Sequence, residues 1–213
     1  MPFKLRDPMS GLTHFVGIIL AAVGLIVLLT RATGPLTLWH AVGFSVFGGA
    51  MVLLYTCSTL YHWAPVAGPH REFLRRLDHM MIFIFIAASY TPICLVTLRG
   101  AWGWSILGTV WGIALAGLVM KVFWLNAPRF VYTLIYVLMG WVIVVGIWPL
   151  SQALALPGLL WMALGGLFYT AGAGIYAAKK PDPWPRIFGF HEIFHVCVMM
   201  GSLAHFWMTY RYI

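Results

Sequence analysis

Seven apolar runs of membrane-spanning length follow one another along the sequence, and they constrain its fold more than any other feature. A helix needs roughly 20 residues to cross a hydrocarbon core of about 30 Å. Inside lipid a helix satisfies its own backbone hydrogen bonds, which an irregular segment cannot do. We therefore expect an all-α fold, that of a polytopic membrane protein with seven transmembrane helices. The runs lie near residues 12–30, 39–63, 78–98, 103–120, 130–149, 157–177 and 189–210.

The composition and the breaks between the runs agree with this class. The chain is 62% hydrophobic and 8% charged, whereas a soluble domain carries about 25% charged residues. The breaks are short and contain Pro or Gly, as in Pro65–Pro69 and Asn126–Pro128, and none resembles an interdomain linker. We expect one seven-helix transmembrane domain over residues 1–213.

The basic residues indicate how the helices are oriented. A net charge of +8 would suggest nucleic acid as the partner of a soluble protein, but here the basic residues lie mostly at the breaks between apolar runs. Membrane lipids, and not nucleic acid, are therefore the expected partners. Ten of the 13 Lys and Arg residues belong to the side that holds the N-terminus, and Arg31, Arg99 and Arg211 belong to the other. The positive-inside rule then predicts a cytoplasmic N-terminus and an outside C-terminus.

Five polar residues mark the ends of three runs. Ser58 and His62 close the second run, Asp78 opens the third, and His191 and His195 open the seventh. In the predicted topology these ends all lie on the cytoplasmic side. Residues four apart project from the same face of a helix, and ionisable residues within a membrane usually face the protein interior. The five side chains are therefore expected to meet.

This set of residues predicts a zinc site. Three imidazole nitrogens with one open position describe a catalytic Zn²⁺ centre, and the ligands would be His62, His191 and His195. A water in the open position would have its pKa lowered toward about 7. Asp78 would accept a hydrogen bond from this water or act as general base. Ser58 would orient the water or an oxyanion, or would bond the carbonyl four residues earlier in its own helix.

Together these motifs resemble the hemolysin III/progestin-and-adipoQ-receptor (PAQR) family, in particular its bacterial hemolysin III branch. The likeness rests on Ser58-x-x-x-His62, Asp78 and His191-x-x-x-His195, with support from Tyr90-Thr91-Pro92 and Gly201-Ser202. The resemblance implies seven helices, zinc on the three histidines near the inner leaflet, and kinship to ceramidase-like amide hydrolases. It also implies a multi-pass protein of the bacterial inner membrane, and the older family label implies cytolysis.

Three functions follow as alternatives. The first is a zinc-dependent hydrolase of a lipid amide or ester that enters from the bilayer. The second is a sensor or receptor in which zinc only holds helices together, and the third is a pore or transporter, including a cytolysin. Retinal binding is excluded because the seventh run contains no Lys for a Schiff base.

Glu192 leaves two interpretations open. It turns the seventh-run motif into His-Glu-x-x-His, the pattern in which a Glu serves zinc peptidases as general base. Alternatively, Glu192 lies at the membrane interface, where the positive end of the helix dipole stabilises an acid. His14, at the start of the first run, is expected near the site but not as a ligand.

Overall fold

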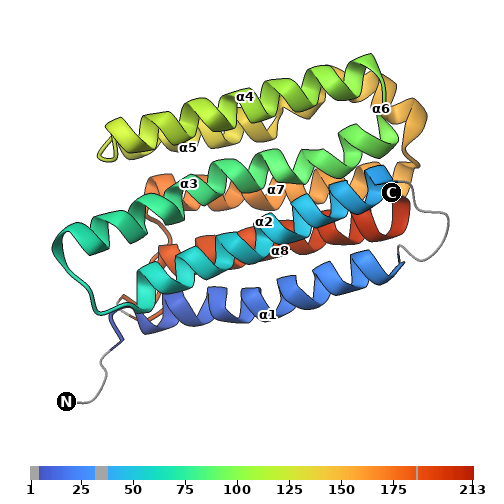
Figure 1. Ribbon diagram of the computed structural model, residues 1–213. Helices are drawn as coiled ribbons and strands as arrows, with labels where there is room; N and C mark the ends of the chain where they lie inside the picture. Colours follow the sequence, from blue (N-terminus) through green and yellow to red (C-terminus); the bar gives the residue numbers. More distant parts are fainter. Residues whose placement is uncertain (1–4, 32–37, 186) are drawn as a thin grey trace.

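Seven long apolar helices account for the computed structural model of the chain, which describes residues 5–31, 38–185 and 187–213 (Figure 1). Within those residues, seven helical segments are long and apolar enough to cross a membrane, which confirms the predicted all-α class and number of spans. The helices are α1 (Pro8–Arg31), α2 (Leu38–Trp63), α3 (Gly68–Pro92) with its extension η1 (Ile93–Thr97), α4 (Ala101–Phe123), α5 (Arg129–Gly140), η2 (Val142–Gly146), α6 (Ile147–Ala153), α7 (Leu156–Ala178) and α8 (Phe190–Tyr212).

The helices run roughly alongside one another as a bundle (Figure 1). Helices α1, α2 and α8 lie together, with α3 against α2 and α7 against α8. Helices α4 and α5 lie on the side of the bundle away from α1. Large side chains such as Phe47 and Phe83 fill the interior, whereas Leu20 and Ile26 on α1 point outward and are more than half exposed. Such an apolar outer surface is what a lipid-facing helix requires.

The fifth span departs from the single helix that the run at 130–149 predicts. Helix α5 ends at Gly140, a 3₁₀ turn follows, and α6 continues from Ile147. The Tyr90 hydroxyl supports this break: it donates to the carbonyls of Met139, at 3.0 Å, and Gly140, at 2.6 Å, and accepts from the Ile143 N–H at 3.2 Å. Irregular backbone is tolerated at membrane depth where protein groups take over the lost helical bonds.

The ends of several helices meet at one end of the bundle, called here the proximal end. Helices α1, α3 and α8 begin at this end, and α2 and α7 finish there (Figure 1). This arrangement brings together the residues that the sequence places on one side. Lys4 and Arg186, which count toward the predicted orientation, lie outside the described residues. The assignment of the proximal end to the cytoplasm stays a prediction.

Candidate metal centre

Three histidines from two helices converge at the proximal end. His62 comes from the last turn of α2, and His191 and His195 come from the first two turns of α8. One ring nitrogen of each lies within 4.8 Å of those of the other two. His62 and His195 are buried, at 4% and 2% exposure, and His191 is half-buried. The structure therefore assembles the predicted ligand set as a group that could hold a metal ion.

Hydrogen bonds on the far side of two of the rings determine which nitrogen faces inward. His62 donates from Nδ1 to Asp7 Oδ2 at 3.4 Å, and this bond holds the pKa of the Asp7 carboxyl below its ordinary value. His195 donates from Nδ1 to the Ser10 carbonyl at 3.2 Å, with Thr13 Oγ1 at 2.9 Å from the same nitrogen. In both rings Nε2 is left with its lone pair, as metal-binding histidines require.

The spacing of the nitrogens suits one tetrahedral ion. The Nε2 atoms of His62 and His191 are 3.1 Å apart. Two ligands on one tetrahedral zinc, at about 2.0–2.1 Å from it, lie about 3.3 Å from each other. Neutral imidazoles whose outer nitrogens are hydrogen-bonded are also the usual donors to zinc. The residues present therefore fit the ion that the sequence predicts.

Ser58 and Asp78 lie at the same end of the bundle. Ser58 is one turn before His62 on α2 and is 1% exposed. Its hydroxyl hydrogen-bonds the carboxyl of Asp78 on α3, and Asp78 is near enough to His62 to interact electrostatically. Both side chains line the same cavity as His191 and His195. All five predicted site residues are thus brought together.

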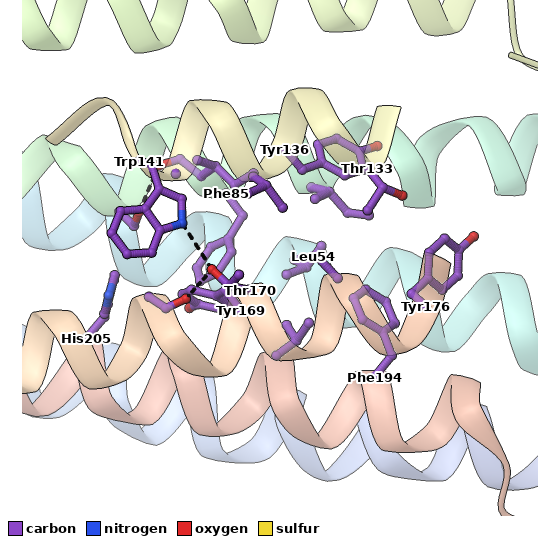
Figure 2. Close-up of a pocket in the computed structure, with 18 of the residues that line it drawn as sticks. Leu54, Phe85, Thr133, Tyr136, Trp141, Tyr169, Thr170, Tyr176, Phe194 and His205 are labelled. Carbon is purple, nitrogen blue, oxygen red and sulfur yellow. Dashed lines mark hydrogen bonds between the residues drawn. The ribbon is translucent and has the colours of Figure 1, made fainter. Parts of the chain in front are cut away.

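A long cavity of about 350 Å³ leads from this site into the bundle. It runs between α3 and α5 on one side and α7 and α8 on the other, from Tyr176 and Phe194 near the histidines to Trp141 and His205 at its far end (Figure 2). The lining is mostly apolar and aromatic. Such a space suits a hydrocarbon chain.

The far half of the cavity reaches the outer surface of the bundle. Several residues line the cavity and also face outward: Trp141 at 45% exposure and Val144 at 48% on the fifth span, and Leu167 at 59% on α7. The Trp141 indole bridges the two sides by donating to Thr170 Oγ1 at 3.1 Å (Figure 2). This opening between the fifth span and α7, called here the lateral mouth, faces the depth at which lipid chains lie.

Comparison with known proteins identifies the family. The family described as Haemolysin-III related matches residues 4–206. The chain belongs to the hemolysin III family. It is 36% identical to Hemolysin-3 of Bacillus cereus over 212 residues, covering 99% of this chain and 93% of that protein. It is 34% identical to the Hemolysin-3 homolog of Bacillus subtilis strain 168, over 99% of this chain and 96% of that protein.

More distant hemolysin III relatives include eukaryotic proteins. The human Monocyte to macrophage differentiation factor is 24% identical over 182 residues, which cover 82% of this chain and 72% of that protein. Heptahelical transmembrane protein 1 of Arabidopsis thaliana is 28% identical over 83% of this chain and 57% of that protein. These likenesses confirm the resemblance to PAQR proteins that the motifs indicate.

In this member of the hemolysin III family, both carboxylate oxygens of Glu192 accept hydrogen bonds from the protein itself. Its Oε2 accepts the Gly189 N–H at 2.8 Å and so caps α8, while Oε1 accepts the hydroxyl of Ser10 on α1. Of the two sequence interpretations, the structure favours the one at the helix N-terminus. The side chain anchors α1 to α8 beside the histidines.

Besides His14, which the sequence predicts near the site, the start of α1 and the residue before it contribute side chains and a carbonyl that sequence reasoning missed. Asp7, Ser10 and Thr13 all contact the ligand histidines from outside the site. His14 stacks on His195 with ring centroids 3.6 Å apart, is 4% exposed and lines the cavity. The signal that was available is the spacing of positions 10 and 14, which are four apart and so share one face of a helix that starts at the proximal end. Asp7 precedes this helix.

Proposed function

We propose that this hemolysin III family membrane protein is a zinc-dependent hydrolase of lipid amide or ester bonds. The three histidines His62, His191 and His195 are called here the triad. The observation that carries the proposal is that the triad, together with Asp78 and Ser58, lies at one end of an apolar cavity. A structural metal site, which only holds helices together, needs no such cavity beside it. A lipid in the cavity would have its chain in the apolar part and its polar linkage beside the histidines.

The proposed reaction would use the zinc ion and the side chains of the protein for different tasks. Zinc on His62, His191 and His195 would supply Lewis acidity and a water made acidic enough to react near neutral pH. Asp78 would act as general base toward the attacking water and would return the proton to the leaving amine or alcohol. The Ser58 hydroxyl holds the Asp78 carboxyl in place by the hydrogen bond between them. The apolar walls exclude bulk water from the reacting groups.

The lateral mouth gives the substrate its route. A lipid would slide from the bilayer between Val144 and Leu167, so that it never has to leave the hydrocarbon. With the N-terminus in the cytoplasm, the scissile bond would lie at the depth of the inner leaflet of a bacterial plasma membrane. The membrane lipids are then both the solvent and the source of substrate.

A receptor or sensor with structural zinc is the second candidate, favoured by one observation: the triad joins α2 to α8 at a single point. Zinc removal would then lower the melting temperature, and no turnover would be found in any lipid mixture. The name of the Bacillus cereus relative adds a cytolytic pore as a third candidate. Dye flux from reconstituted liposomes above that of empty ones would support it.

The deciding experiment is hydrolysis of long-chain N-acyl amides by purified protein in lipid bilayers, with zinc content measured on the same samples. We expect turnover by the wild type and a loss of about 10²- to 10⁴-fold in Asp78→Ala with zinc retained. His70→Ala, an exposed change outside the cavity, serves as the control. Equal turnover in Asp78→Ala and the wild type would contradict the mechanism.

A further inference from the structure

A cluster of basic side chains lies at the proximal end, apart from the metal centre. The turn between α4 and α5 is at this end (Figure 1). Arg75 of α3, Lys121 in the last turn of α4 and Arg129 at the start of α5 meet there, and they are called here the basic cluster. All three lie near enough to His79 to interact with it electrostatically, and Lys121 also interacts with Arg75. None of the three lines the cavity, so the cluster is separate from the space proposed for the substrate.

The protein supplies no counter-ion to the basic cluster within the described residues. There, ion pairs are made by Asp7 alone, with Arg6 and His62. Lys121 is the extreme case, because its side chain is 0% exposed and its Nζ has no hydrogen-bond partner in the described part of the chain. The Nζ atom lies 3.5 Å from the centroid of the Tyr132 ring. A buried cation without a paired anion costs free energy, and a negative charge nearby would offset that cost.

The two arginines, both partly exposed, present the basic cluster to the outside. Arg75 donates from Nη2 to Asn126 Oδ1 at 2.6 Å, in an exposed hydrogen bond at the turn between α4 and α5. Arg129 donates from Nη1 to the Tyr176 carbonyl at 3.0 Å, which leaves its Nε and Nη2 for a ligand. Helix α5 begins here without a capping side chain and without an acid in its first turn, so its positive end adds to the field. Guanidinium groups in such a field suit a phosphate, whose oxygens they bind in pairs.

An apolar outer surface borders the basic cluster. Phe123, two residues after Lys121, is 84% exposed, and on α5 Phe130 is 67% and Leu134 54% exposed. Phe130 and Leu134 are four residues apart, so they follow one face of α5 away from the proximal end. A phosphate carried on hydrocarbon chains fits both surfaces, because headgroup phosphates lie at the membrane surface and the chains lie below them.

We propose that the basic cluster binds the phosphate of an anionic phospholipid whose chains lie along the outer faces of α4 and α5. Arg75 and Arg129 contact the phosphate, and Lys121, which has no exposed surface, contributes its charge from within. A zwitterionic phospholipid binds more weakly, because its quaternary ammonium is repelled by the same cations. The site goes beyond the proposed function, since it requires neither zinc nor turnover.

The test measures the dissociation constant of the first bound lipid by native mass spectrometry of the purified full-length protein in detergent. The probes are dioleoyl phosphatidylglycerol and dioleoyl phosphatidylcholine, which carry the same chains. Each cation near a lipid surface contributes about 5-fold in affinity, so we expect phosphatidylglycerol to bind about 10- to 100-fold more tightly. Equal affinity for the two lipids would overturn the proposal. Displacement of phosphatidylglycerol by millimolar glycerol 3-phosphate or inorganic phosphate would also overturn it, since the site would then be one for a free phosphate.

Variants locate the lipid. Arg75→Gln/Arg129→Gln should erase the preference while phosphatidylcholine binds as before, which shows that the protein is still folded. Lys121→Met keeps the buried stem without its charge and should weaken phosphatidylglycerol about 5-fold.

The matched control is Arg31→Gln/Arg99→Gln, which removes two exposed cations at the other end of the bundle and should keep the preference. A preference that survives in Arg75→Gln/Arg129→Gln, or that is lost in the control, would contradict the assignment. Absence of lipid hydrolysis would overturn the proposed function and leave this binding test standing.

Discussion

At the scale of single residues, the first two turns of α1 and the residue before them complete the metal centre. The Asp7 carboxylate and the Ser10 carbonyl each accept a hydrogen bond from a ligand histidine. These bonds orient the rings and raise the basicity of the inward nitrogens. We therefore expect metal affinity at this candidate centre to depend on residues that would not touch the ion.

Replacing Asp7 by Ala should lower zinc affinity about 10- to 100-fold, the usual effect of losing such an outer partner. His62 would lose the acceptor for its Nδ1–H, and its ring would be free to turn. Competition with a chromophoric chelator measures the affinity. Glu72→Ala removes an exposed acid on α3 and is the matched control. Unchanged affinity in Asp7→Ala would show that the hydrogen bond between Asp7 and His62 does not support the centre.

A substitution at Glu192 distinguishes the two roles that the sequence leaves open for it, the general base of a zinc peptidase and an acid that stabilises the N-terminus of α8. Glu192→Gln keeps one oxygen that can accept the Gly189 N–H, and its NH2 group can donate to the Ser10 oxygen in place of accepting from it. Zinc content and any lipid hydrolysis should therefore stay within about 3-fold of wild type, the effect of weakening one hydrogen bond. A zincin general base would instead lose about 10²-fold or more. Turnover of Glu192→Gln beside the wild type measures the difference.

The site could be predicted from the sequence only in part. His62, Asp78 and His191 follow from span order and side, because a membrane span fixes the depth of its ends. The hydrogen bonds of Asp7 and Ser10 to the histidines could not be predicted, because they join the start of α1 and the residue before it to helices that lie far away in sequence. Such contacts depend on which helices pack as neighbours, and apolar periodicity does not carry that information.

At the scale of the elements, the broken fifth span shapes the cavity. The run at 130–149 is continuously apolar, so its hydropathy predicts one straight helix. The break after Gly140 depends on a tyrosine of α3 that supplies the missing backbone partners. The sequence contains Tyr90, but it does not indicate which backbone groups the Tyr90 hydroxyl will bind.

Tyr90→Phe should therefore destabilise the protein by about 1–3 kcal/mol, since the Ile143 N–H and two carbonyls lose their shared partner. Unfolding in detergent micelles followed by circular dichroism measures the change. Tyr212→Phe, near the end of α8, is the control because its hydroxyl makes no hydrogen bond to a described residue. If the two variants unfold alike, Tyr90 does not support the break.

At the scale of the whole molecule, the seven spans and the basic residues predict an orientation. In a variant without its three cysteines, Asp182→Cys between α7 and α8 should react with a membrane-impermeant maleimide only after the cells are opened. Ala101→Cys, at the exposed start of the fourth span, should react in intact cells. The reverse pattern would place the metal centre at the outer leaflet.

The central claim is that His62, His191 and His195 hold a zinc ion, and elemental analysis of protein purified without chelator tests it most directly. The wild type should contain about one zinc per chain, and His191→Ala/His195→Ala should contain almost none, because a single remaining imidazole cannot retain the ion. His70→Ala should keep the wild-type content. An absence of zinc in the wild type, after growth with zinc supplied, would contradict the account and reduce the triad to a hydrogen-bonded packing cluster.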